Sequence, residues 1–90
     1  QGSILINREG RMRADYEYIK FLQLQTPGRK TGTWTCRSVR LPNVELGRVV
    51  WYGAWRQYCF NPAPNTIYSA GCLRDIQDFL GQVMTEKRIA

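Results

Sequence analysis

One aromatic segment, residues 46–62, constrains the fold more than any other part of the chain; it reads Leu-Gly-Arg-Val-Val-Trp-Tyr-Gly-Ala-Trp-Arg-Gln-Tyr-Cys-Phe-Asn-Pro. β-branched and aromatic residues suit a pleated, half-buried surface. Gly53 supplies the backbone freedom that a tight connection needs. We therefore predict a β-hairpin with residues 49–51 on its first arm and residues 55–60 on its second arm.

The register of this hairpin decides which side chains share a face. We predict that Trp51 lies opposite Trp55, which places Val49 opposite Gln57 and Gly47 opposite Cys59. The other face then holds Leu46, Arg48, Val50, Arg56, Tyr58 and Phe60. A slip of one residue would exchange the two faces.

The segments around the hairpin complete an α+β fold. Residues 16–25 and 33–39 have the composition of strands and flank a Pro-Gly turn. Trp34 and Cys36 are predicted on one side of the second strand and Arg37 on the other. Residues 66–68 are predicted as a short edge strand.

A C-terminal helix is predicted over residues 70–86, with Ser69 as its N-cap. Its apolar stripe consists of Cys72, Leu73, Ile76, Phe79, Leu80 and Val83. The stripe is expected to pack on the Val49, Trp51, Trp55 and Cys59 side of the hairpin. The predicted architecture is an antiparallel three- to four-stranded sheet packed on one C-terminal helix in two layers.

The chain has 90 residues, which suffice for one domain. We assign residues 14–90 to a single α+β domain and residues 1–13 to a tag remnant or a flexible N-terminal arm. The opening Gln-Gly-Ser is typical of the residue of a cleaved affinity tag.

Composition argues against an enzyme or a metal protein. The chain has no histidine and only three cysteines, which are widely spaced, so we predict no metal site and no cofactor. The odd number of cysteines also predicts a reducing, cytoplasmic location. Asp75 and Asp78 are predicted on the wet side of the helix, where Asp78 can pair with Arg74, and no catalytic residue is assigned. No segment is long and apolar enough to cross a membrane.

Positive charge is concentrated in the strand-rich part of the chain. The net charge is +6, and residues 16–62 contain seven basic residues against two acidic ones. This favours an acidic partner. We predict that DNA or RNA binds a basic aromatic sheet face: Arg37, Arg48 and Arg56 hold phosphates, Tyr58 stacks on a base, and Arg29 and Lys30 anchor the turn.

Two alternatives use the same surface. One is a protein-interaction module without a nucleic-acid role: an inhibitor of a host enzyme, for which an acidic host protein is the expected partner, or a homodimer that buries the aromatic surface. The other is a binder of an anionic, nucleotide-type ligand. Exposed arginines beside aromatic rings also occur where they only pack flat on them.

The pattern Trp-Tyr-Gly-x-Trp-Arg-Gln-Tyr-x-Phe-x-Pro at residues 51–62 resembles a group of small uncharacterised proteins from bacteriophages and other mobile DNA. The resemblance continues through Thr66, Ser69, Cys72-Leu73, Asp75-Ile76 and Phe79, and it implies a mobile-element origin without a particular activity. At the level of fold alone, strands followed by one helix are similar to the arm-type DNA-binding domains of tyrosine recombinases and to the plant ethylene-response domain. Both of those use a sheet face on DNA; their diagnostic residues are not matched here.

Overall fold

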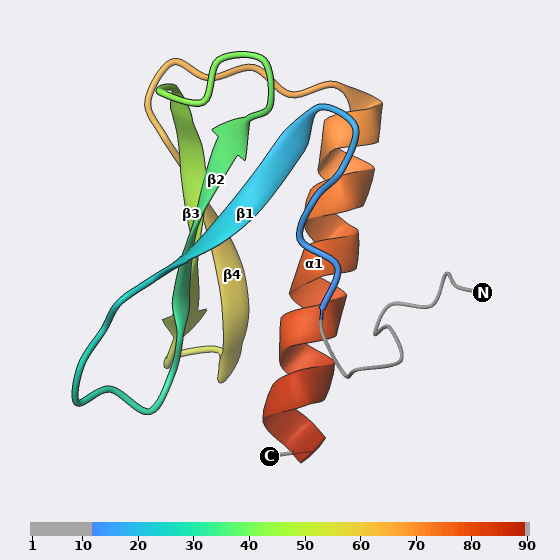
Figure 1. Ribbon diagram of the computed structural model, residues 1–90. Coiled ribbons are helices and arrows are strands. Elements are labelled where there is room, and N and C mark those ends of the chain that lie inside the picture. Colours follow the sequence, from blue (N-terminus) through green and yellow to red (C-terminus); the bar gives the residue numbers. More distant parts are fainter. Residues whose placement is uncertain (1–11, 90) are drawn as a thin grey trace.

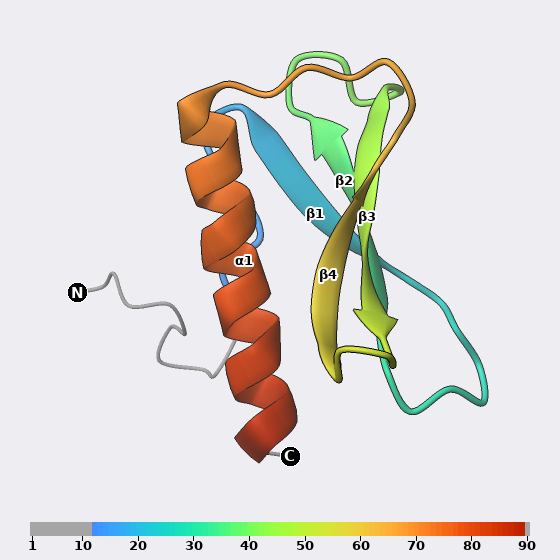
Figure 2. The same ribbon diagram turned by 180° about the vertical axis from the view of Figure 1, so that it is seen from behind.

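The computed structural model describes residues 12–89, with side chains up to Lys87. They form one four-stranded antiparallel sheet, in the order β1-β2-β3-β4, and one helix. The elements are β1 (Ile19–Leu24), β2 (Thr33–Ser38), β3 (Glu45–Tyr52), β4 (Gln57–Pro62) and α1 (Ala70–Ile89). The helix lies along one face of the sheet in both views (Figures 1 and 2). The predicted two-layer α+β fold is confirmed.

The strand register separates the sheet into two faces. One row across the sheet pairs Gln23 with Trp34, Trp34 with Val49, and Val49 with Phe60, and it faces the helix. The neighbouring row faces away from the helix. We call this second side the helix-free face; its residues are Lys20, Leu22, Leu24, Thr33, Thr35, Arg37, Glu45, Arg48, Val50, Tyr52, Gln57, Cys59 and Asn61.

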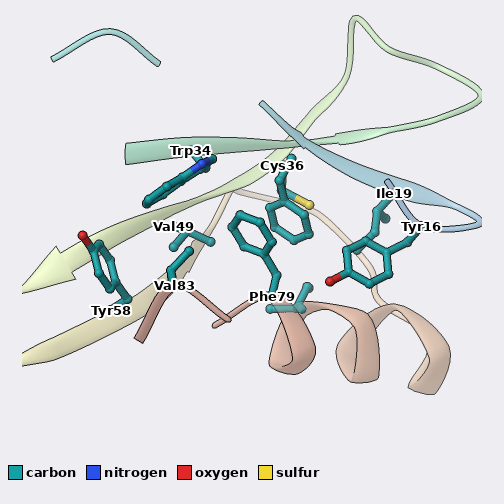
Figure 3. Close-up of a cluster of buried hydrophobic side chains, with 10 residues drawn as sticks. Tyr16, Ile19, Trp34, Cys36, Val49, Tyr58, Phe79 and Val83 are labelled. Carbon is teal, nitrogen blue, oxygen red and sulfur yellow. The ribbon is translucent and has the colours of Figure 1, made fainter. Parts of the chain in front are cut away.

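The core lies between the helix and the sheet and is largely aromatic (Figure 3). Phe79 of α1 is fully buried and stacks on Phe21 of β1, with ring centroids 4.0 Å apart. Trp34 meets Phe79 edge to face at 5.7 Å. Large aromatic rings allow such a short chain to bury enough apolar surface for stability.

Gly47 of β3 faces the helix without a side chain of its own. A Cβ atom there would lie 2.5 Å from the Phe60 ring and 2.6 Å from the backbone oxygen of Asn61. The absence of a Cβ lets the ring cross the strand, which explains why a strand interior tolerates a glycine.

The outer edge of β1 is covered by the segment before it. The Phe21 amide donates to the Ala14 carbonyl and the Tyr16 amide to the Ile19 carbonyl, both at 2.9 Å. Fully buried Gln82 of α1 accepts from the amide of Arg13 at 2.7 Å and donates to its carbonyl at 2.9 Å. Residues 1–11 of the predicted N-terminal arm lie outside the described residues.

The predicted hairpin register is wrong. Trp51 pairs with Tyr58, and Tyr52 pairs with Gln57, because the connection is a four-residue turn over residues 53–56. The slip is an odd number of residues, so it turns every side chain of β4 to the opposite face. Arg56 adopts the left-handed backbone conformation, with φ 55°, which an arginine in the sequence does not predict.

Several predicted boundaries also change. Residues 66–68 are not a strand; the Thr66 hydroxyl instead donates to the Ala63 carbonyl at 2.8 Å, and the Tyr68 hydroxyl donates to the Leu46 carbonyl. The N-cap is confirmed, since the Ser69 hydroxyl accepts from the Cys72 amide at 3.2 Å. The helix continues to Ile89, and Leu73 of its predicted apolar stripe is exposed.

Candidate nucleic-acid interface

Arg37 and Arg48 lie on the helix-free face, as predicted. Alternation along β2 turns Trp34 and Cys36 into the core and Arg37 away from it. Arg48 pairs with Asn61 on the adjacent strand. Lys20, which the sequence analysis did not select, is the cross-strand partner of Arg37 and extends the basic row.

Both arginines already have partners within the protein. The Arg48 Nε donates to the Glu45 carboxylate at 2.7 Å, and the Thr35 hydroxyl donates to the same oxygen at 2.6 Å. These two hydrogen bonds, of which the one from Arg48 has the larger effect, hold the pKa of the Glu45 carboxyl below its usual value. The Arg37 guanidinium donates to the backbone carbonyls of Pro42 and Asn43 at 3.3 and 3.4 Å. This half of the surface is therefore only partly free to bind anions.

The other three predicted cations lie at one end of the sheet. Arg29 and Lys30 belong to the β1–β2 loop and Arg56 to the β3–β4 turn. The two connections leave the same end of the antiparallel sheet, at the bottom of Figure 1. We call this region, residues 25–32 and 53–56, the turn end. Neither segment contains an acidic residue, and all three cations are exposed.

Tyr58 is not available for stacking, contrary to its predicted position. Its side chain is buried on the helix side, edge to face with Trp34 and with Trp51. The backbone amide of Gly32 donates to its hydroxyl oxygen at 3.2 Å. Tyr58 therefore holds the base of the loop that carries Arg29 and Lys30.

Two aromatic residues that the predicted site did not include are exposed at this end of the sheet: Trp55 lies within the turn end, and Tyr52 is the last residue of β3 directly before it. Tyr52 is 45% exposed and Trp55 is 65% exposed, with ring centroids 5.0 Å apart and the rings nearly perpendicular. The predicted register placed Trp55 against the helix and thereby hid it. Trp55 in fact occupies the turn, whose length the residue types alone did not reveal.

A cavity of about 420 Å³ opens at the same end, between the β1–β2 loop and the C-terminal half of the helix. Its walls combine Lys30 and Lys87 with Glu86 and the edges of Trp34 and Tyr58. Lys87 also lies over the Trp51 ring at 4.9 Å. The mixed charge and the near-complete burial of both rings make it a weaker anion site than the surface of the turn end.

Acidic side chains are placed away from the turn end, with the exception of Glu86. Asp15 lies at the outer edge of β1, where its backbone forms an antiparallel β-bridge with the backbone of Lys20. Asp78 is not simply solvated, because it accepts a hydrogen bond from the buried Tyr16 hydroxyl at 2.7 Å. Burial and this carboxylate raise the pKa of Tyr16 above its ordinary value. Asp78 therefore has a structural partner on the helix side of the sheet.

The fold and the surface together define a small two-layer α+β domain with a basic, aromatic turn end. Over 72 residues, the chain is 29% identical to an uncharacterised 9.3 kDa protein of Acholeplasma phage L2, an alignment that covers 80% of this chain and 91% of the phage protein. No family model and no solved structure matches the chain significantly. The similarity supports the predicted phage origin. The hairpin motif of that group and the likeness to recombinase arm domains stay predictions.

Two further properties of residues 12–89 bear on the classes considered. Their one long helix lacks the hydrophobicity that a bilayer crossing requires. Their Cys, Asp and Glu side chains form no group of three placed to hold a metal ion.

Proposed function

We propose that this small protein of phage origin binds nucleic acid through its turn end, with the adjoining helix-free face as a secondary contact. The observation that carries the proposal is the meeting of Arg29, Lys30 and Arg56 at one end of the sheet, beside an exposed aromatic pair. Phosphates provide the charge that such a surface attracts, and aromatic rings accept bases.

The geometry favours the turn end over the centre of the sheet. Among the side chains that the structure describes, the one ion pair within 4 Å joins Arg48 to Glu45 on the helix-free face. The cations of the turn end are thus available to an external anion without first losing a carboxylate. Lys20, Arg37 and Arg48 extend the positive surface along the sheet, so a strand of nucleic acid that crosses the turn end can continue along this face.

A salt titration tests the proposal. If three phosphates are contacted, the affinity for a labelled oligonucleotide should fall about 20- to 40-fold between roughly 50 and 200 mM salt. Replacing Arg29, Lys30 or Arg56 singly by Ala should each reduce the slope of log affinity against log salt by about 1. Fluorescence anisotropy on the full chain measures both quantities.

The matched control is Arg74→Ala, which removes the same charge from an exposed position near the start of α1. It should leave the salt slope unchanged. Equal losses for Arg74→Ala and the turn-end variants would show that only net charge matters. No binding to DNA or RNA at about 50 mM salt would refute the proposal.

Two other binding partners, a second copy of the chain and an anionic small molecule, can be distinguished by separate measurements. A second copy of the chain would use the apolar part of the helix-free face, where Leu22 is 47% exposed, and would double the mass measured by light scattering. An anionic small molecule would use the cavity and raise the melting temperature in a nucleotide panel. Either result without oligonucleotide binding would replace the proposal.

A further inference from the structure

The aromatic pair at the turn end has no role in the core. Trp55 is the most exposed aromatic ring among the described side chains, and Tyr52 beside it is nearly half exposed. In an edge-to-face pair, at least one face of each ring is left uncovered by its partner. The pair therefore presents flat apolar surface to the solvent next to Arg56.

The turn presents these rings on a fixed support. The Trp55 amide donates to the Tyr52 carbonyl, and the Arg56 amide donates to the Gly53 carbonyl, each at 3.2 Å. Tyr52 itself belongs to β3 and pairs with Gln57. A turn whose backbone is held in this way loses little backbone freedom when one of its rings binds a flat partner.

We infer that the turn end recognises single-stranded nucleic acid by stacking an unpaired base on Trp55, with Tyr52 as its support. This inference rests on the proposed function and specifies its partner. Arg56 follows Trp55 directly, and Arg29 and Lys30 lie at the same end of the sheet, so phosphates on either side of the stacked base meet positive charge. Stacking on an aromatic ring does not require a particular base, because every base has a flat face.

A duplex is the weaker partner for this surface. Its base faces are covered by their neighbours, and exposing one requires the base to be unstacked and unpaired at a cost in free energy. A single strand offers its bases without that cost. The cations of the turn end contact phosphates in both forms, so the aromatic pair is what separates the two.

The experiment compares a labelled pyrimidine oligonucleotide of roughly 15 nucleotides with the duplex of the same sequence, at constant salt, for the wild type, W55A and W55F. Loss of one stacked base should weaken single-strand binding by W55A about 5- to 150-fold. Duplex binding should change less than about twofold. W55F keeps a ring and should retain most of the single-strand affinity.

The control variant is Ile67→Ala, which shortens another exposed apolar side chain in the β4–α1 connection, at the opposite end of the sheet. It should bind both oligonucleotides like the wild type. Because Trp55 is exposed, W55A should keep the wild-type circular dichroism and melting temperature.

The outcomes separate the inference from the proposed function. Salt-dependent binding with equal affinity for single strand and duplex, unchanged in W55A, would overturn the inference and leave the proposed function standing. Equal weakening of both complexes by W55A would also overturn it. Failure of the wild type to bind either oligonucleotide would refute both.

Discussion

The two faces of the sheet are built from alternate residues of the same strands, yet they differ in almost every physical property. The face that packs against the helix consists of aromatic and aliphatic side chains that form the core with α1. The helix-free face mixes charged residues, threonines and a few partly exposed apolar side chains. We expect stability to be concentrated on the first face, because most side chains of the second face are exposed or half-buried, with buried Thr33 and Thr35 as exceptions. Binding residues are therefore expected on the second.

The largest expected difference between the faces is in stability. Phe79→Ala removes a fully buried ring that contacts Phe21 and Trp34, and it should lower the free energy of unfolding by about 3–5 kcal/mol. The corresponding truncation on the other face, Leu22→Ala, should cost under about 1 kcal/mol. Urea denaturation measures both. Similar losses for the two variants would contradict the contrast between the faces.

A smaller effect concerns the charge on the helix-free face. Glu45 forms an ion pair with the Arg48 guanidinium, and Glu45→Gln removes the negative charge of that pair. The substitution should therefore raise nucleic-acid affinity about two- to fivefold. Asp75→Asn on α1 makes the same charge change away from this face and serves as the control. An unchanged affinity for Glu45→Gln would remove Arg48 from the interface.

The same ion pair predicts a weak pH dependence of stability. The folded pKa of Glu45 is depressed below its usual value of 4.5, chiefly by the Arg48 hydrogen bond and then by Thr35. Its contribution is therefore present above the unfolded pKa and is lost as the pH falls through the folded pKa. Because the pair is solvent-exposed, the effect should be small. Glu45→Gln should lack this part of the acid dependence in urea titrations below about pH 5.

The fold could be predicted because its signals are local and redundant. Alternation in β2 assigned Trp34 and Cys36 to the core and Arg37 to the opposite face, and a repeat of three and four residues identified the helix. The hairpin register could not be predicted in the same way. It depends on the length of one turn, and the residue that closes that turn in a left-handed conformation is Arg56, not a glycine.

That single turn also explains which site residues were identified from the sequence. The face on which Arg37 lies is set by alternation within β2, and the positions of Arg29 and Lys30 are set by the Pro-Gly loop. None of these three predictions depends on the register of the hairpin. The predicted position of Tyr58 does depend on the hairpin register, and Tyr58 is in fact buried on the helix side of the sheet. Trp55 was missed for the same reason, since its exposure follows from the turn and not from its residue type.

On our proposal, the turn end is the surface that contacts nucleic acid. Titrating the ¹⁵N-labelled protein with a single-stranded oligonucleotide tests it directly, because every backbone amide reports its own surroundings. We predict that the largest changes in amide chemical shift occur in residues 25–32 and 53–56, with smaller changes at Arg37 and Arg48. Changes confined to α1 or to the β4–α1 connection would contradict the account.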